Sequence, residues 1–400
     1  MNQEKNLVLF TTSYPYGKGE SFLEAEINYL SEQFDKVIIF PIQITSEIRK
    51  TPSNVTVNSE WNKIRSGNNI AYLKVLFQEN LYKNLSFSWK FNIRLAHYIA
   101  IDIKFQKVIS YLEDKSLIDS SIFYTYWLAA HTVSLAFMKR KFPRLKVVTR
   151  VHGIDLYEER SGIKEFPFRR IVLDNLNLVF SISKDGINHI NRKYGTRTNL
   201  ALSRLGTINP KTNNPISAQN KFHVVSCAFL RPLKRIDLLI EALGHFNKTK
   251  FEITWSHIGG GDLLDTLKDK AEKELIQVQY NFKGNMSNKD IFYFYKNTPI
   301  DLFTNVSEYE GIPVSIMEAQ SFGIPVLATD VGGVSEIVNN INGFLIEKDI
   351  SSKELFEKML SIFENKPNLM KKRELSKINW LENYDADKNY ESHVKLLKSL

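Results

Sequence analysis

The sequence is poor in cysteine, since Cys227 is the only one in 400 residues. A single thiol excludes an intramolecular disulfide and a zinc site built from cysteines, and it favours a reducing compartment. The first residues, MNQEKNLVLFTTSYP, lack a basic region followed by a long apolar run, so we expect no signal peptide. No cluster of histidine and aspartate in the sequence suggests a catalytic metal, and we expect neither a metal nor another cofactor.

Long hydrophobic runs are also scarce. Residues 120–138 carry no formal charge and precede KRK, which would suit a membrane span. However, they contain a histidine, two threonines and two tyrosines, and they divide into a strand (IFYTY) and a helix (WLAAHTVSLAFM). The glycines at 259–261 do not spell GxGxxG, which argues against a dinucleotide-dependent oxidoreductase. We therefore expect a soluble or peripheral protein.

The composition is that of a globular protein, with 43% hydrophobic and 24% charged residues, and the length suits two domains. The net charge of +9 is uneven, because residues 1–210 carry +10 and residues 211–400 carry −1. This asymmetry suggests that one half faces an anionic partner, either a membrane surface or nucleic acid. No motif of a nucleic-acid-binding module is present, so we do not expect nucleic acid.

Apolar runs alternate with amphipathic stretches along both halves of the chain. LVLFTT, ESFLEAEINYLSEQF and KVIIFPI begin the first series, and FHVVSCAF, RIDLLIEALGHF and FEITWSHIGGG begin the second. This βα alternation predicts an α/β protein with two Rossmann-like, doubly wound parallel sheets. We place the first domain at 1–207, a polar linker with two prolines at 208–221, and the second domain at 222–380. Two such domains in series generally bind their ligand in the cleft between them.

The stretch EYEGIPVSIME contains Glu310 and Glu318, eight residues apart, across a predicted helix start. Pro313 suits the first helical position, and the glycine and proline at 323 and 325 end the helix. The free backbone amides from Gly311 to Val314, including Ile312, could then hold a phosphate.

Two carboxylates invite comparison with a glycoside hydrolase. Eight helical residues span about 12 Å, whereas hydrolytic carboxylates lie about 5–9.5 Å apart, so the spacing disfavours that activity. Carboxylates also accept hydrogen bonds from vicinal hydroxyls, so the two acids could hold a sugar and a ribose on either side of a phosphate. By spacing alone, a solvated helix face remains an equal alternative.

Three further features are candidates for a site. Lys234 and Arg235, in KRID, follow a strand and open a helix, where cations could neutralise a diphosphate. His152, in VTRVHGIDLY, ends a strand and precedes a glycine. Gly17 and Gly19, in YPYGKGES, allow close approach between the first strand and helix, although this loop is no Walker motif.

The sequence also carries a family resemblance. EGIPVSIMEAQSFGIPVLATDVGGVSEIV resembles the E-x7-E signature of glycosyltransferase family 4, whose members have the GT-B fold and retain the anomeric configuration. VVSCAFLRPLKRIDLLIEAL is similar to the family's second donor-site element, and TRVHGIDLYEE and FTTSYPYGKGESFLEAEI are similar to its acceptor-domain segments. The resemblance covers most of the chain and is strongest over 222–347.

The resemblance implies that the second domain binds a nucleotide-sugar. It places Glu318 on the ribose hydroxyls, and Glu310 and the amides of Gly311 and Ile312 on the transferred sugar and the distal phosphate. Lys234 and Arg235 would contact the diphosphate, and Arg231 would replace an arginine that many members have upstream of the lysine. The resemblance also implies a catalytic role for His152 and places Pro313 and Val314 in the donor site. It further implies an acceptor or phosphate loop formed by Gly17, Lys18, Gly19 and Asp155.

The resemblance therefore predicts a retaining, metal-independent glycosyltransferase in which no enzymic nucleophile is needed. The donor would be a UDP-sugar, with GDP as the alternative, and the acceptor a glycan or lipid-linked glycan in surface polysaccharide assembly. The segment from Leu381 to the last residue would cross back onto the first domain. Two alternatives remain, a nucleotide-sugar epimerase of the same fold and a binding protein for an anionic polymer.

Location is a separate prediction. The basic segments KRKFPRLK at 139–146 and YKNLSFSWKFNIR at 82–94 suggest peripheral attachment to an anionic membrane, on its cytoplasmic face. The alternative is that these charges only keep the domain soluble.

Overall fold

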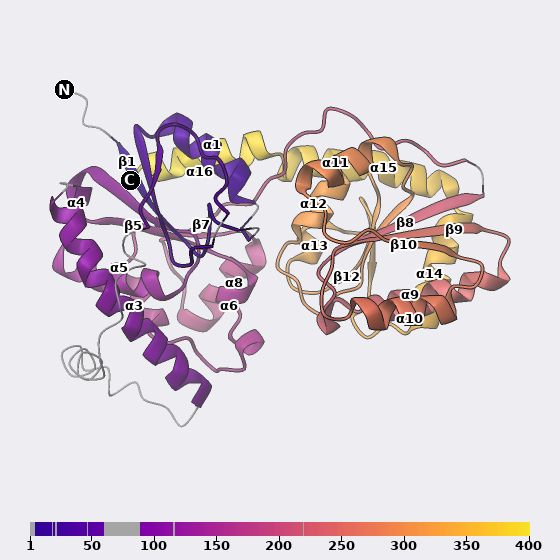
Figure 1. The fold of residues 1–400 in the computed structure, drawn as a ribbon, viewed down its shortest axis with the longest axis horizontal. Helices are drawn as coiled ribbons and strands as arrows, with labels where there is room; N and C mark the ends of the chain where they lie inside the picture. Colours follow the sequence, from indigo (N-terminus) through magenta and orange to yellow (C-terminus); the bar gives the residue numbers. More distant parts are fainter. Residues whose placement is uncertain are drawn as a thin grey trace. The chain divides into compact units, whose positions relative to one another are not determined.

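The structure is a computed structural model of the chain. It describes residues 5–17, 19–20, 22–45, 47–59, 89–114, 117–218 and 220–400. They form two compact units, each built on a parallel sheet with helices packed against it (Figure 1). Unit 1 comprises Met1–Arg204 and Tyr390–Leu400, and unit 2 comprises Leu205–Asn389.

The described strands of unit 1 form a seven-stranded sheet in the order β3-β2-β1-β4-β5-β6-β7, and all neighbours are parallel. The strands are β1 (Asn6–Thr11), β2 (Lys36–Pro41), β3 (Val55–Val57), β4 (Ser121–Thr125), β5 (Lys146–Val151), β6 (Leu178–Ser181) and β7 (Leu200–Leu202). Every residue of β1 is buried, as expected for a central parallel strand that is covered on both faces.

Helices cover both faces of this sheet because alternate strand residues point to opposite sides. Leu7 and Leu9 of β1 pack in one core with helices α1 and α16, whereas Val8 and Phe10 pack in another with α3, α5 and α7. The described helices of unit 1 are α1 (Leu23–Gln33), α3 (Trp89–Asp114), α4 (Leu117–Ser120), α5 (Ala130–Lys141), α6 (Gly153–Leu156), η3 (Glu158–Ser161), α7 (Arg169–Asn175) and α8 (Lys184–Tyr194), and α16 (Ala386–Lys398) adds its Tyr390–Lys398 part.

A buried polar network joins α1, β5 and α16 within unit 1. Glu26 and Arg150 form an ion pair, and both side chains are fully buried. Tyr124 donates a hydrogen bond to Oε1 of Glu26 at 3.2 Å, and Nη2 of Arg150 donates to Oγ of Ser203 at 3.0 Å. Nδ1 of His393, on α16, lies 2.9 Å from the same Ser203 hydroxyl. Burial, and then the charge of Arg150, keep the pKa of His393 well below its usual value.

The described strands of unit 2 form a six-stranded sheet in the order β10-β9-β8-β11-β12-β13, again with parallel neighbours. The strands are β8 (Lys221–Cys227), β9 (Glu252–Ile258), β10 (Gln279–Phe282), β11 (Leu302–Asn305), β12 (Val326–Thr329) and β13 (Phe344–Ile346). The helices described here are η4 (Pro232–Lys234), α9 (Ile236–Gly244), η5 (His245–Lys248), α10 (Leu264–Glu274), α11 (Asn288–Asn297), α12 (Val314–Ser321), α13 (Val334–Ile337), α14 (Ser352–Glu364) and α15 (Lys366–Asn383).

Each sheet has a point where the chain changes direction across it. In unit 1 the chain runs outward from β1 to β3 and then returns to the centre at β4, next to β1. In unit 2 it runs from β8 to β10 and returns at β11, next to β8. Open α/β sheets bind their ligands at such a point, outside the carboxyl ends of the strands.

The prediction of two doubly wound α/β domains is confirmed. Some element boundaries were wrong. The helix expected from Trp127 begins at Ala130, because Trp127–Ala129 form a turn closed by a hydrogen bond from the Ala129 amide to the Trp127 carbonyl at 2.9 Å. The uncharged stretch 120–138 forms β4 and α5. Throughout the described ranges, helices that combine the length and apolarity of a membrane span are absent.

Candidate active site

Glu310 lies in the loop between β11 and α12 of unit 2, and its side chain is largely buried. Its Oε1 accepts hydrogen bonds from Nζ of Lys234 at 2.5 Å and from Nδ2 of Asn305 at 3.2 Å. Lys234 ends the 3₁₀ turn η4 after β8, and Asn305 is the last residue of β11. The two strands at the switch point of this sheet therefore bring together the predicted cation and the predicted acid.

Hydrogen bonds within and around the two loops fix this pair in place. The amide of Glu308 donates to the carbonyl of Leu233 at 2.8 Å, so the loop after β11 is tied to the loop after β8. Oδ1 of Asn305 accepts from the amide of Ser307 at 3.2 Å, and the Ser307 carbonyl accepts from the Thr329 hydroxyl at 2.6 Å. The Glu310 loop is thus preorganised rather than free to adjust to a ligand.

The turn before α12 offers backbone donors. Pro313 is the N-cap residue of α12 and Val314 is its first residue, so the predicted position of Pro313 was wrong by one residue. Among the described residues we find no acceptor for the amides of Gly311, Ile312 and Val314. Unsatisfied amides at the positive end of a helix dipole suit the oxygens of a phosphate.

A second loop packs directly on this turn. The amide of Gly333, after β12, donates to the carbonyl of Gly311 at 3.1 Å. A Cβ atom at position 333 would lie 2.8 Å from that carbonyl oxygen and 2.9 Å from Cγ1 of Ile312. The absence of a side chain at Gly333 thus permits the contact that shapes the turn.

Glu318 lies on α12 and is 6% exposed. Its Oε1 accepts a hydrogen bond at 2.5 Å from Nδ2 of Asn288, the first residue of α11. Burial raises the pKa of Glu318 to about 7, and the bond from Asn288 opposes this shift only in part. Burial and the nearby Glu318 also raise the pKa of the Cys227 thiol, at the end of β8. Within the described chain no cation pairs with Glu318, so hydroxyl donors of a ligand would stabilise its carboxylate.

The other two predicted cations do not reach Glu310. Arg235 has a left-handed backbone, with φ 48° and ψ 42°, and its guanidinium donates to the carbonyls of Val306 and Lys348, each at 2.6 Å. It therefore ties together the loops that follow β8, β11 and β13. Arg231 is exposed, and its guanidinium carbon lies 6.0 Å from the centre of the Phe229 ring.

The glycine run after β9 has a packing role. Gly259 and Gly261 have φ angles of +132° and +157°. A Cβ at these positions would lie 2.0 Å from the Ala228 carbonyl oxygen and 2.6 Å from the Leu230 carbonyl oxygen. These glycines let the β9 loop press against the loop that carries Lys234, so the run shapes the site without forming a dinucleotide motif.

In unit 1, Glu20 organises the loop after β1. Its carboxylate accepts hydrogen bonds from the amides of Thr12, Ser13 and Tyr14 at 3.0, 2.7 and 2.7 Å. It also accepts from Nε1 of Trp127, in the turn after β4, at 2.5 Å. Glu20 thus joins the two loops at the switch point of this sheet.

The predicted glycines lie in this loop. Gly17 has a φ of +63°, and its amide donates to the carbonyl of Glu47 at 2.9 Å, so it approaches the segment after β2 rather than α1. A Cβ at Gly19 would lie 3.1 Å from Oγ of Ser13. Lys18 lies outside the described residues.

His152 follows β5 and is 6% exposed. Its amide donates to Oδ1 of Asp155 at 2.6 Å, and Oδ2 of Asp155 accepts from the amide of Leu128 at 2.8 Å. Nδ1 of His152 is 3.8 Å from Asp155, too far for a hydrogen bond, and neither ring nitrogen has a hydrogen-bond partner among the described residues. Asp155 therefore links the loops after β4 and β5, and the imidazole keeps its polar atoms unused.

Several residues of these loops were missed from the sequence. Asn305, Asn288, Glu20, Trp127 and Gly333 all fix the position of a predicted residue or of its loop. Asn305 and Trp127 end or closely follow predicted strands, a position that could have marked them. Asn288 could not be found in this way, because its partner is thirty residues distant in the sequence.

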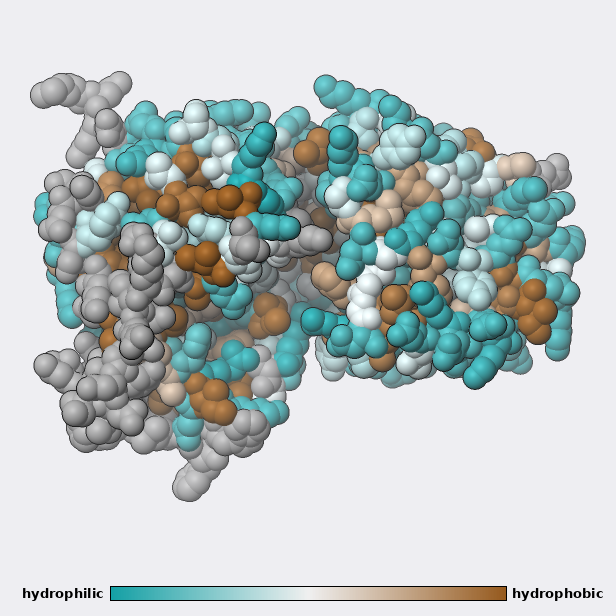
Figure 2. Space-filling view, viewed as in Figure 1, coloured by the Kyte–Doolittle hydropathy of each residue, from teal (hydrophilic) through white to brown (hydrophobic). Residues whose placement is uncertain are grey.

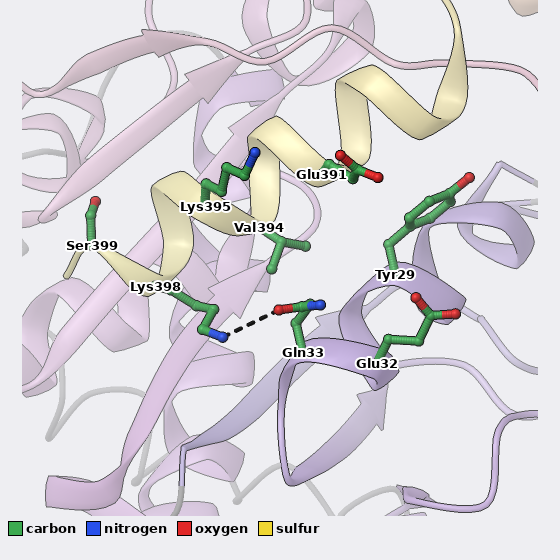
Figure 3. Close-up of a pocket in the computed structure, with 8 residues that line it drawn as sticks. All are labelled: Tyr29, Glu32, Gln33, Glu391, Val394, Lys395, Lys398 and Ser399. Carbon is green, nitrogen blue, oxygen red and sulfur yellow. Dashed lines mark hydrogen bonds between the residues drawn. The ribbon is translucent and has the colours of Figure 1, made fainter.

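A cavity of 490 Å³ lies elsewhere, between α1 and α16 (Figure 3). Nζ of Lys398 donates to Oε1 of Gln33 across it at 3.2 Å. It contains none of the predicted site residues, being lined by Tyr29, Glu32, Gln33, Glu391, Val394, Lys395, Lys398 and Ser399. In the described part of the chain, no group of three or more histidine, cysteine, aspartate or glutamate side chains could hold a metal ion.

Part of the chain is similar in sequence to known glycosyltransferases. Residues 210–378 match the family model "Glycosyl transferases group 1". The chain is 33% identical over 160 residues to the O-antigen biosynthesis glycosyltransferase WbnH of Escherichia coli, covering 39% of this chain and 42% of WbnH. The chain thus aligns with less than half the length of this relative.

Solved structures extend the likeness to the whole chain. Anabaena Alr3699/HepE in complex with UDP has a TM-score of 0.69 and 18% identity, covering 98% of this chain and 100% of that protein. Its complex with UDP-glucose has a TM-score of 0.66 and 18% identity, covering 99% and 100%. These likenesses show the fold, which is GT-B.

Proposed function

We propose that the protein is a glycosyltransferase that moves a sugar from a nucleoside-diphosphate sugar, with UDP as the carrier, onto a glycan or lipid-linked glycan. The observation that carries this proposal is the grouping of Lys234, Glu310 and the turn amides at the switch point of unit 2. The match of residues 210–378 to a glycosyltransferase family, and the UDP bound by a protein of the same fold, support it.

Each group has a task in this proposal. The amides of Gly311, Ile312 and Val314 bind the distal phosphate, and the ammonium of Lys234 balances the charge that grows on the diphosphate as it leaves. Glu310 accepts hydrogen bonds from hydroxyls of the transferred sugar, and Glu318 accepts them from the ribose. Arg235 acts as a positioning residue, since its guanidinium is committed to two carbonyls.

We further propose that the reaction retains the anomeric configuration and needs no metal. The bond between the anomeric carbon and the diphosphate oxygen breaks, and the acceptor oxygen forms its bond on the same face. The hydroxyl proton passes to the departing phosphate oxygen. Lys234 and the helix amides supply the electrostatic stabilisation that a metal ion gives in other enzymes.

A ligand panel tests the proposal. UDP-, GDP- and dTDP-sugars are compared by thermal shift, because a ligand that binds only the folded state raises the apparent stability. We expect a UDP-sugar to raise the melting temperature of the wild-type protein and of a surface control, Glu357→Gln, but much less that of Lys234→Ala. A panel without any stabilising nucleotide, or equal stabilisation of Lys234→Ala, would contradict the proposed site.

We also propose that unit 1 attaches to the anionic, cytoplasmic face of a membrane during surface polysaccharide assembly. Arg144 is largely exposed, and α5 ends with Lys139, Arg140 and Lys141. On α3, Ile93 is 57% exposed, and residues 82–88 of the second basic segment lie outside the described ranges. Figure 2 shows hydrophobic side chains among hydrophilic ones on the viewed face of unit 1, a mixture that suits a lipid interface.

Sedimentation with vesicles tests this attachment. We expect the protein to pellet with anionic but not neutral vesicles, and to be released by salt. Lys141→Glu with Arg144→Glu should weaken binding, whereas the control pair Lys268→Glu with Lys353→Glu, in unit 2, should not. Recovery in the supernatant with anionic vesicles at low salt would disprove attachment and leave the enzymatic proposal intact.

A further inference from the structure

Trp127 occupies an unusual place for a large apolar side chain. It lies two residues beyond β4, at the switch point of the unit 1 sheet, and its side chain stays partly exposed. By contrast, Trp255 and Trp380 are fully buried. An indole that keeps part of its surface in water, at the edge where such sheets bind ligands, is available to contact a ligand.

The indole is held in one orientation. Its Nε1 donates to Glu20 at 2.5 Å, and its backbone carbonyl accepts from the Thr132 hydroxyl and the Ala129 amide, each at 2.9 Å. The His152 ring lies 4.3 Å away between ring centres, and the Tyr126 ring 5.8 Å away. A rigid aromatic surface binds a ligand with little loss of side-chain entropy.

Two features of the neighbouring loop complete the surface. Asp155 ties the loop of His152 to the turn of Trp127 through the Leu128 amide, so the two loops form one edge. On that edge Ile154 is 69% exposed. His152 is more than nine-tenths buried, and its ring nitrogens are without hydrogen-bond partners in the described chain, which leaves a polar group to be satisfied beside the indole.

We propose that Trp127 is a stacking platform for a pyranose ring of the acceptor. One face of a pyranose presents C–H groups that suit the negatively charged face of an aromatic ring, while its hydroxyls reach polar groups at the rim. The indole supplies the aromatic face, with the exposed aliphatic side chain of Ile154 beside it. The unsatisfied imidazole of His152 supplies a polar group for the hydroxyls. Glu20 already accepts five hydrogen bonds, the fifth from Oγ of Ser13 at 3.4 Å, so it acts as a positioning residue rather than as a ligand.

This inference rests on the proposed function and assigns the acceptor to unit 1. The groups assigned to the nucleotide belong to unit 2. Removal of the Trp127 indole should therefore weaken acceptor binding and leave nucleotide binding unchanged. The main competing explanation is structural, because the indole N–H also supports the loop after β1. Phenylalanine separates the two roles, since it keeps an aromatic face but loses the N–H donor.

The experiment compares wild-type protein with Trp127→Phe, Trp127→Ala and a control, Tyr111→Ala, which removes an exposed aromatic ring from α3. UDP release from a UDP-sugar is measured against 4-nitrophenyl and methyl glycosides of glucose, galactose and N-acetylglucosamine. UDP binding is measured separately by calorimetry. Binding of the same glycosides is followed by the fluorescence difference between wild type and Trp127→Phe, and far-UV circular dichroism checks folding.

We expect Trp127→Ala to raise the KM for the glycoside about tenfold, equivalent to about 1.4 kcal/mol, with UDP binding unchanged. Trp127→Phe should raise it only about two- to threefold, and Tyr111→Ala not at all. Equal losses in the Phe and Ala variants would show a purely structural role and overturn the inference. So would an unchanged KM, or failure of every glycoside to act on or bind the wild-type protein. Failure of the wild-type protein to bind UDP would instead refute the proposed function.

Discussion

Replacing Glu310 by glutamine should strengthen UDP binding while it weakens sugar transfer. The Lys234 ammonium lies 2.5 Å from the Glu310 carboxylate. A diphosphate that recruits Lys234 must therefore displace an existing ion pair. Glutamine removes the negative charge but keeps the shape and an amide oxygen, so the lysine becomes available at a lower cost.

The size of the effect follows from the burial of the pair. The lysine and glutamate side chains are 20% and 11% exposed. The pair therefore lies between a surface pair, worth about 0–1 kcal/mol, and a fully buried one, whose disruption costs about 3–5 kcal/mol. We take about 1–2 kcal/mol, which is a factor of about 5–30 in affinity. UDP, which has no sugar, should gain this factor in Glu310→Gln. The UDP-sugar should gain less, because its hydroxyls lose a charged acceptor.

Calorimetry with UDP measures the gain, and UDP release with acceptor measures turnover. Glu357→Gln, which removes an exposed glutamate of α14, is the matched control and should change neither. In Lys234→Ala the benefit of a second Glu310→Gln change should largely disappear, because the competition is for Lys234. Unchanged or weaker UDP binding by Glu310→Gln would refute the argument that the ion pair competes with the diphosphate.

Four further outcomes are expected. Lys234→Ala should slow transfer by about a hundredfold, as loss of one preorganised electrostatic group commonly does. Wild-type turnover should survive EDTA. Loss of activity in EDTA with recovery in manganese would show that a metal is required. Burial raises the pKa of Glu318 to about 7, so the folded protein favours the neutral form of this side chain. The neutral form therefore contributes stability below the ordinary pKa of glutamate, and this contribution is lost as the pH rises through about 7. Glu318→Gln should therefore raise the melting temperature of the ligand-free protein more at about pH 8 than at about pH 5, and an equal change at both would contradict the shift. Arg150→Ala should lower the free energy of unfolding, measured by denaturant titration, by about 3–5 kcal/mol, because it leaves Glu26 buried and unpaired. The double change Glu26→Leu with Arg150→Met should lower it by less. Additive losses from the two changes would contradict the pairing.

The parts of the fold that could be predicted depend on local signals. Strands such as β1 are buried on both faces, so they appear in the sequence as continuous apolar runs with turn residues around them. Helix boundaries were less certain, as the start of α5 shows. The turn Trp127–Ala129 is stabilised by Thr132, in the first turn of α5, and by Glu20, which lies 107 residues before Trp127 in the sequence and which no local rule connects to it.

Some features of the candidate site could likewise be predicted from the sequence, and others could not. From the sequence, Lys234 and Glu310 could be assigned to the same edge of the sheet, because each follows a predicted strand and parallel strands end at one edge, but their ion pair was not predicted. Adjacent cations cannot be distinguished so easily. The left-handed backbone of Arg235 directs its side chain to two carbonyls, and both of those carbonyls belong to later loops. The buried network around Glu26 could not be predicted from the sequence. A glutamate in an amphipathic helix is ordinarily exposed, and the other members of this network come from β5 and α16.

The division of the chain into units has a consequence for its synthesis. Unit 1 starts first but includes Tyr390–Leu400, and Val394 and Leu397 belong to the core that packs on α1. Until these residues leave the ribosome, the fully buried Glu26 and Arg150 side chains lack the helix that bears His393. Translation of Leu205–Asn389 takes roughly ten to forty seconds at about 5–20 residues per second. For that interval the first unit to emerge holds an uncovered apolar face, so a chaperone that binds such faces has most time to act on the α1 side of this sheet.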